Sequence, residues 1–152
     1  MRRLRAARLS AAGLLAGLAF AWGAQAAEFR TVADSAAVMY DAPSKASTPL
    51  YVASRFYPLE VIVNLESWVK VRDHTGTLSW VEKKALSTRR MVIVTAPNVD
   101  VRSRPDDASP VAFQATQNVA LDLVEILPDG WLRVRHADGA TGYVKAGLVW
   151  GN

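Results

Sequence analysis

Cysteine is absent from this chain of 152 residues, and histidine occurs only twice. Without cysteine the chain can form neither a disulfide nor a thiolate zinc site, and it has no cysteine nucleophile and no lipid-anchored cysteine. His74 and His136 alone do not favour a metal site built from several imidazoles. The length admits one or two small domains and excludes a large multidomain enzyme. We therefore predict no metal site and no cofactor.

The chain also lacks a net charge once its first residues are set aside. Lysine and arginine number 18 and aspartate and glutamate 14, so the formal net charge is +4. Four of the arginines lie within residues 1–8, in a segment that we expect to be removed, which leaves 14 basic residues against 14 acidic ones. A neutral chain does not present the positive surface that phosphate binding needs. Nucleic acid is therefore not an expected partner.

The first 26 residues have the three parts of a secretory signal peptide. Residues 1–8 are basic, residues 9–22 form an uncharged run rich in leucine and alanine, and residues 24–26 read Ala-Gln-Ala. The run of 14 residues is shorter than the ~20 that cross a bilayer, which disfavours a retained membrane anchor. Cleavage after Ala26 would leave 126 residues with no membrane span. We predict a periplasmic protein, with full secretion left open because a leader directs only the first membrane crossing.

The chain after the leader contains an internal repeat. Residues 66–81 (ESWVKVRDHTGTLSWV) and 129–144 (DGWLRVRHADGATGYV) match at an offset of 63, with five of sixteen positions identical. Upstream, Pro49 aligns with Pro110 and Leu59 with Leu121 if one or two gaps are allowed. We predict two domains, 27–88 and 89–152, in a monomer. The boundary near 87–90 (STRR) lacks glycine and proline, so we expect the two units to pack against each other.

The residue pattern of each unit is typical of β-strands. Residues 59–65 alternate with a period of two, and so do 68–72 and 131–135. Asp138-Gly139 predicts a two-residue hairpin turn, and Pro128-Asp129-Gly130 predicts another turn. The alternation changes phase near Val124, which predicts a bulge. We find no helical period, and five or six short strands per unit predict an all-β protein of two small closed barrels.

Two stretches of the second unit resemble the signature of the bacterial SH3-like domains of exported and cell-wall proteins. Residues 98–105 read NVDVRSRP, and residues 130–144 contain GWLRVR and TGYV. The first unit keeps the closing half, as SWVKVR and LSWV, but residues 36–43 read AAVMYDAP, without Arg-Ser-x-Pro. The resemblance implies tandem SH3-like barrels, each with a short 3₁₀ turn near its end, at Lys83–Leu86 and Lys145–Leu148. It also implies a binding or targeting role and no catalytic residues.

Four aromatic residues of the closing strands allow two interpretations. They can fill and cap the barrels, or they can form an aromatic groove that grips an extended peptide. Trp131 is the preferred groove residue because it shares a strand face with Arg133 and Arg135, and guanidinium groups beside a ring can hold a carboxylate-bearing peptide. The four aromatic residues are Trp68, Trp80, Trp131 and Tyr143.

The long loop of each unit, residues 41–49 and its counterpart after Arg102, borders the recognition surface in the resembled family. Alternatively, Tyr51 belongs to the core, and Arg102 and Arg104 pair with Asp106 or Asp107. His74 and His136 are expected in solvated turns. The predicted ligand-binding residues are Tyr40, Tyr51, Arg102, Arg104, Trp131 and Arg133.

The sequence thus favours a non-catalytic exported module that binds cell-wall (peptidoglycan) peptide or other peptide segments. An adaptor that docks onto another exported protein or a membrane complex is the alternative. A cell-wall hydrolase is a third hypothesis, because a pair of carboxylates can act on glycosidic bonds, but such a small barrel offers little cleft to house it.

Overall fold

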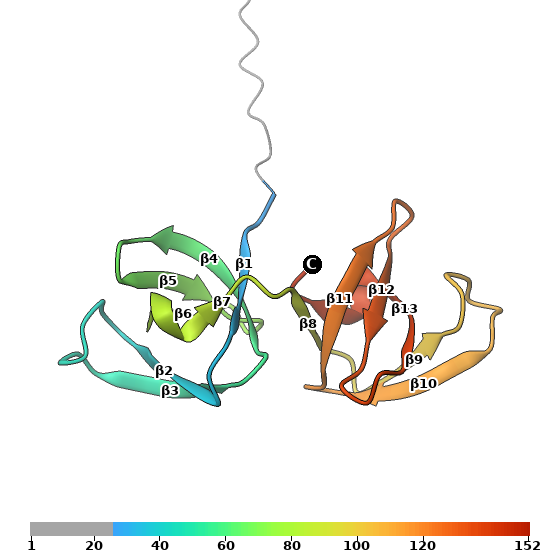
Figure 1. Cartoon of the computed structure of the whole chain (residues 1–152), viewed down its shortest axis with the longest axis horizontal. Helices are drawn as coiled ribbons and strands as arrows, with labels where there is room; N and C mark the ends of the chain where they lie inside the picture. The colour runs from blue at the N-terminus through green and yellow to red at the C-terminus, as the bar shows by residue number, and fades with distance from the viewer. Residues whose placement is uncertain (1–25) are drawn as a thin grey trace, which may run out of the picture.

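The computed structural model describes residues 26–152, so the predicted signal peptide lies almost wholly outside the described residues. The described chain is almost entirely β-structure, in two seven-stranded antiparallel sheets that each curl into a small barrel (Figure 1). This confirms the predicted fold class of two tandem small barrels. Within residues 26–152 we find no helix long and apolar enough to cross a membrane.

Barrel one is formed by β1 to β7, with the spatial order β3-β2-β6-β5-β4-β1-β7. A 3₁₀ turn, η1 (Lys83–Ala85), precedes its last strand. Its strands are β1 (Phe29–Val32), β2 (Ala36–Tyr40), β3 (Pro49–Ser54), β4 (Pro58–Asn64), β5 (Trp68–Arg72), β6 (Leu78–Glu82) and β7 (Leu86–Ser87).

Barrel two repeats this order as β10-β9-β13-β12-β11-β8-β14, with η2 (Ala146–Leu148) as its 3₁₀ turn. The strand count of seven exceeds the predicted five or six because the two-residue β7 and β14 also pair. Its strands are β8 (Met91–Val94), β9 (Asn98–Arg102), β10 (Val111–Thr116), β11 (Ala120–Ile126), β12 (Trp131–Arg135), β13 (Thr141–Lys145) and β14 (Val149–Trp150).

The two barrels correspond residue by residue. The offset is 62 from β1 through β4 and 63 from β5 onward, because the turn between β11 and β12 has one residue more than its counterpart. Leu59 and Leu121 are equivalent, as predicted, and both are fully buried. The alignment of Pro49 with Pro110 is wrong by one residue, since Pro49 begins β3 and its equivalent Val111 begins β10.

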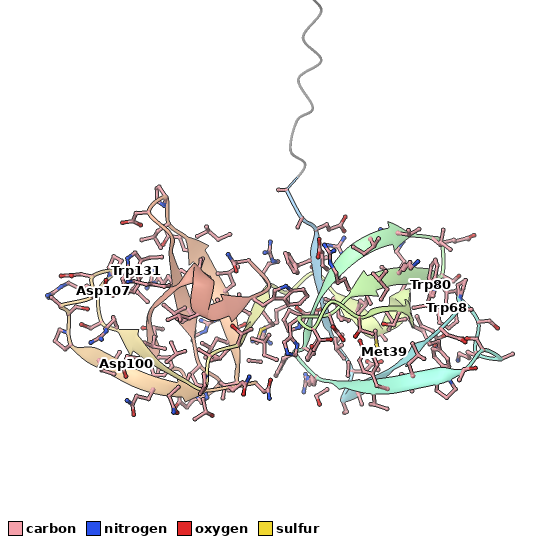
Figure 2. The ribbon with its side chains drawn as sticks, turned by 180° about the vertical axis from the view of Figure 1, so that it is seen from behind. Met39, Trp68, Trp80, Asp100, Asp107 and Trp131 are labelled. Carbon is pink, nitrogen blue, oxygen red and sulfur yellow. The ribbon has the colours of Figure 1, made fainter. Side chains whose placement is uncertain are left out.

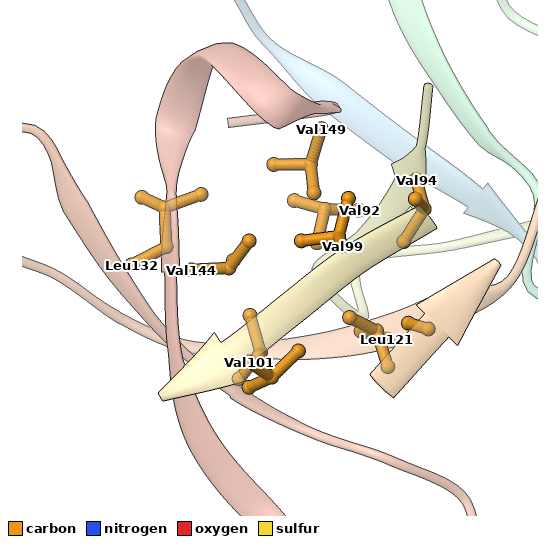
Figure 3. Packing of buried hydrophobic residues seen from close by; sticks show 10 residues of the cluster. Val92, Val94, Val99, Val101, Leu121, Leu132, Val144 and Val149 are labelled. Carbon is orange, nitrogen blue, oxygen red and sulfur yellow. The ribbon is translucent and has the colours of Figure 1, made fainter. Parts of the chain in front are cut away.

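Each barrel has its own apolar core, made by alternate residues of its strands. In barrel one Met39, Leu59 and Val71 are fully buried. Figure 3 shows the core of barrel two, where Leu121 and Val101 lie among residues from β8, β9, β12, β13 and β14. The cores are separate, so each barrel is a packing unit.

A bulge interrupts the fourth strand of both barrels. The pairing of β11 with β12 shifts between Leu123 and Glu125, which confirms the bulge predicted near Val124. The same shift occurs between Val61 and Val63, where none was predicted. The period-two alternation of residues 59–65 therefore does not carry through to burial beyond Val61, because Ile62 is 41% and Val63 38% exposed.

Equivalent hairpin turns connect the last long strands of the two barrels. Gly139 has φ +94°, and its N–H donates to the carbonyl of His136. The loop has three residues, 137–139, with the glycine in the bulge position, so the predicted two-residue turn is wrong. Gly76 has φ +91° and plays the same part in barrel one. The turn at 128–130 is present, with Gly130 at φ +82°.

Candidate binding groove in barrel two

A groove of about 350 Å³ lies at the end of barrel two that faces away from barrel one. Figure 2 shows Trp131 and Asp107 close together at this end, while Trp68 and Trp80 lie at the opposite end of the molecule. Strand β9, the loop that follows it, β12 and the β13–η2 corner supply the lining. Its main residues are Asp100, Arg102, Asp107, Trp131, Lys145 and Leu148.

Trp131 forms the apolar side of the groove. It is the first residue of β12 and follows the turn at Gly130. Only 8% of the residue is exposed, so most of the indole packs into the barrel and a small part borders the groove. Lys145 Nζ lies 5.5 Å from the centre of the ring, which places a cation over the indole.

Arg102 is held in place from two sides. Its guanidinium donates to the Ser109 carbonyl at 3.2 Å and to Asp100 Oδ2 at 3.4 Å. Asp100 Oδ1 in turn accepts from the Gln114 side-chain amide at 2.8 Å. The predicted alternative, that Arg102 or Arg104 pairs with Asp106 or Asp107, is wrong: Arg102 pairs with Asp100 on the same strand face, and Asp107 pairs with Lys145. Within residues 26–152 no ion pair joins Arg104 to Asp106 or Asp107.

Two further contacts shape the loop beside the groove. The buried Ser109 donates its hydroxyl to the carbonyls of Arg104, at 3.0 Å, and Asp106, at 2.9 Å, and so fixes the loop. Asp107 and Lys145 then form an ion pair at 2.6 Å across the groove. The groove therefore contains two cations and two carboxylates, each with a neighbour of opposite charge.

The structure brings together only two of the six predicted ligand-binding residues, Arg102 and Trp131. Arg104 is exposed outside the groove, and Arg133 is exposed on β12 opposite Tyr143. The sequence analysis did not select Asp100, Asp107 or Lys145. The alternation of β9 gave a signal for Asp100, which shares its strand face with Arg102; the other two depend on how the loop folds over β13.

The same place in barrel one has different chemistry. Tyr40, the equivalent of Arg102, packs edge-on against Trp68 with ring centres 5.6 Å apart. Lys45 and Glu82 form an ion pair at 3.4 Å with the charges reversed relative to Asp107 and Lys145. The hollow beside Tyr40 has only about 160 Å³. A larger hollow of about 450 Å³ near Glu66 is lined by charged residues and one serine and has no aromatic lining residue.

Tyr51 is not part of the same surface as Tyr40. It packs against the core of barrel one, and its hydroxyl donates to Asp73 Oδ2 at 2.9 Å. Burial is the main cause that raises the pKa of Tyr51 to about 12, so its phenol stays protonated. His74 is half-buried against the Tyr57 hydroxyl, so the prediction of a solvated turn is wrong for His74.

Asp73 is the buried carboxylate of this cluster. Its burial acts to raise its pKa, but hydrogen bonds from the Thr75 and Tyr51 hydroxyls and from the Thr77 and Thr75 N–H groups outweigh that effect. The pKa of Asp73 therefore lies below its usual value. The carboxylate fixes the hairpin turn, and its oxygens are occupied by donors from the protein itself.

A family model described as bacterial SH3 domain matches the chain twice, at residues 33–88 and 95–151. The chain belongs to the bacterial SH3 domain family, and it contains two such domains in tandem. The resemblance seen in the sequence is thereby confirmed, including for the first unit, whose opening strand departs from the signature. The 3₁₀ turns that the resemblance implied are present as η1 and η2. No curated protein matches the sequence.

Several solved structures are similar to this chain at low identity. NlpC2 from Trichomonas vaginalis is 15% identical, with a TM-score of 0.39 over 84% of this chain and 49% of that protein. NlpC1 from the same organism is 14% identical, with a TM-score of 0.39 over 86% and 48%. An NlpC/P60 family protein from Bacillus cereus is 17% identical, with a TM-score of 0.36 over 80% and 55%. The chain thus spans about half the length of each.

Proposed function

We propose that this protein is a non-catalytic, exported binding module whose second barrel holds peptide segments of cell-wall material. The predicted leader supports export to the periplasm, with full secretion the alternative destination. The observation that supports a binding role most directly is the groove where Trp131 lies beside Arg102 and Lys145. Membership of the bacterial SH3 domain family supports a binding module rather than an enzyme.

The chemistry of the groove favours a segment with charges of both signs. A carboxylate can be bound by Arg102 and Lys145, and an ammonium group by Asp100 and Asp107. A ligand with only one sign would leave half of these groups without a partner when it displaces the Asp107–Lys145 ion pair. Trp131 supplies an apolar contact for the backbone or side chains between the charges.

Co-sedimentation with purified sacculi tests this proposal. We expect Arg102→Gln to weaken binding about tenfold, which is ~1.4 kcal/mol, because it removes a charged donor from the groove. Arg133→Gln is the matched control: Arg133 is exposed on the strand of Trp131 but outside the groove, so its loss should leave binding unchanged. Trp131→Ala should damage folding more than binding, because it empties a largely buried site.

Three results would contradict the proposal. Full recovery of the wild-type protein in the supernatant at micromolar concentration would show that it does not bind cell-wall material. Equal losses of binding in Arg102→Gln and Arg133→Gln would show that the groove is not the binding site. Clearing of a cell-wall suspension by the protein would contradict the non-catalytic role.

The adaptor alternative is supported by an apolar face on barrel one (Val38, Leu50 and Val52), and affinity capture of a stoichiometric exported protein tests it.

A further inference from the structure

The outer face of β2 and β3 in barrel one exposes a strip of aliphatic side chains. Val38 and Val52 are directly opposite each other across the two strands, and they are 39% and 61% exposed. Leu50, on the same face of β3, is 47% exposed. Three exposed branched residues side by side form an apolar patch on a small barrel, and such a patch is a candidate interaction surface.

Barrel two shows that the fold does not require this patch. The residues equivalent to Val38, Leu50 and Val52 are Asp100, Ala112 and Gln114. There the Gln114 side-chain amide donates to Asp100 Oδ1 at 2.8 Å, so the same pair of strands is covered by a polar contact. Both strand pairs have the same length and register, so the apolar strip is a property of the barrel-one sequence and not a demand of its backbone.

The backbone beside the strip is also available for pairing. Strand β3 is the terminal strand of its sheet, and among residues 26–152 its one hydrogen-bonded strand neighbour is β2. A terminal strand presents N–H and C=O groups to which an extended peptide can add as a further strand. In Figure 1 β3 lies along the rim of barrel one and ends close to barrel two.

A cavity of about 210 Å³ lies between the barrels at the end of β3. Ser54, Arg55 and Tyr57 line it from barrel one, and Ile93 and Asn118 from barrel two. The Arg55 guanidinium lies 4.8 Å from the Phe56 ring centre, and within residues 26–152 it has no carboxylate in salt-bridge range. The apolar strip therefore ends at an uncompensated positive charge.

We propose that the edge of β3 binds an extended aliphatic peptide as an added strand, with the peptide's C-terminal carboxylate against Arg55 in the cavity between the barrels. The peptide runs parallel to β3, its alternate side chains beside Leu50 and Val52. Charge complementarity with Arg55 selects a free C-terminus, and the apolar strip selects aliphatic residues. This site is separate from the groove of barrel two, so it does not depend on the cell-wall binding proposed for that groove; its apolar strip is the face that supports the adaptor alternative.

Isothermal titration of the exported protein, with both barrels, tests the site. The probe is the peptide acetyl-Thr-Val-Thr-Val-Thr-Val with a free carboxylate, and the comparison is the same peptide with a C-terminal amide. We expect saturable binding with a Kd below about 1 mM, and about tenfold weaker binding of the amide because it loses a charge-assisted hydrogen bond. Binding should be unaffected by Arg102→Gln.

The matched variants come from the second barrel, whose backbone already accommodates the new side chains. Val52→Gln copies Gln114 and Arg55→Gln copies Gln117, and each should weaken binding about tenfold while the melting temperature changes little. Ala112→Gln, on the equivalent edge of β10, is the control and should leave binding unchanged. With Arg55→Gln the preference for the free carboxylate should disappear.

Four outcomes overturn the proposal. The first is absence of saturable binding, and the second is equal affinity for the acid and the amide. The third is a concentration-dependent dimer that Val52→Gln abolishes, because a second copy would then occupy the β3 edge. A peptide affinity that is unchanged in Val52→Gln but lost in Arg102→Gln would assign the peptide to the groove of barrel two and would also overturn it.

Discussion

Phe56 has a backbone conformation that its side chain disfavours. Its φ is +69°, in the left-handed region, where the Cβ of an ordinary residue is crowded by the following carbonyl. Asn118, the equivalent residue of barrel two, has the same φ, and asparagine tolerates that region. The guanidinium groups of Arg55 and Arg89 lie 4.8 Å and 4.7 Å from the centre of the Phe56 ring, and these cation–π contacts offset part of the strain.

The strain and the ring contacts can be separated by two substitutions. Phe56→Ala and Phe56→Asn both remove the ring, but only asparagine suits the left-handed backbone. We expect both variants to be less stable than the wild type, with Phe56→Asn more stable than Phe56→Ala by about 1 kcal/mol. Urea unfolding measures the difference, and equal stabilities would show that the positive φ costs nothing.

The Asp73 cluster predicts a pH dependence of stability. The pKa of Asp73 is lowered in the folded state, so its contribution is fully present above the pKa of the unfolded chain, ~3.9, and is lost as the pH falls through the folded value. Tyr51→Phe removes one of the donors to this carboxylate. At neutral pH we expect the variant to be about 1–2 kcal/mol less stable than the wild type, with a smaller difference in acid.

Urea unfolding of both proteins between pH 7 and pH 3 measures this effect. The range includes ~3.9, the pKa of an unperturbed aspartate. NMR titration of the Asp73 carboxyl provides the direct check: its pKa should rise towards the usual value in Tyr51→Phe. Phe113→Tyr is the matched control, because Phe113 of barrel two is the equivalent of Tyr51. The equivalent of Asp73 is His136, which lies beside Phe113, so the added hydroxyl meets no carboxylate at that position. A stability difference that is the same at every pH would show that Tyr51 acts through packing alone.

At the scale of the strand, the sequence pattern predicts well wherever one face of a strand is buried along its whole length. The alternation of β5 and β12 correctly placed Val71 and Val134 in the cores and Arg72 and Arg135 outside. It failed in β4, where the pairing shifts between Val61 and Val63 and both Ile62 and Val63 are exposed. A bulge is visible in sequence only when it breaks the alternation of apolar and polar residues, and residues 61–63 are all aliphatic.

The candidate groove was predictable only in part, for a related reason. Trp131 and Arg102 lie on regular strands, so their strand faces followed from the sequence. Asp107 lies in an irregular loop whose path depends on the Ser109 hydroxyl bonding to two backbone carbonyls. The contact of Asp107 with Lys145 joins residues 38 positions apart, and no local pattern encodes it.

At the scale of the whole molecule, one carboxylate has changed partner between the barrels. Glu60 in β4 pairs through both of its oxygens with Arg72 of the same barrel, at 2.8 Å and 2.9 Å. The equivalent carboxylate in barrel two, Asp122, pairs in the same way with Arg89 of the connector (residues 88–90), at 2.7 Å and 2.8 Å. Arg135, the equivalent of Arg72, lies farther away, with its Nε 3.8 Å from Asp122 Oδ2. The hydrogen bond from Arg89 is the main cause that lowers the pKa of Asp122.

Arg89 thereby joins the two barrels. Its guanidinium binds Asp122 of barrel two and lies over Phe56 of barrel one, and its carbonyl accepts a hydrogen bond from Thr31 at 2.7 Å. Phe29 and Trp150 add an edge-to-face contact across the boundary, with ring centres 5.2 Å apart. These contacts predict that the barrels tumble as one body, which the cavity at the end of β3 requires.

Amide relaxation by NMR tests this prediction. In the wild type the two barrels should have the same rotational correlation time, and in the double variant Arg89→Ala, Trp150→Ala each barrel should tumble faster, with its own value. Arg72→Ala is the matched control: it removes an ion pair of the same geometry inside barrel one, costing at most about 1 kcal/mol, and should leave the common correlation time unchanged.

Independent tumbling of the wild-type barrels would contradict a fixed interface, and with it the shared site at Arg55. Common tumbling of the double variant would show that the short connector, residues 88–90, and the other contacts across the boundary are enough to hold the two barrels together.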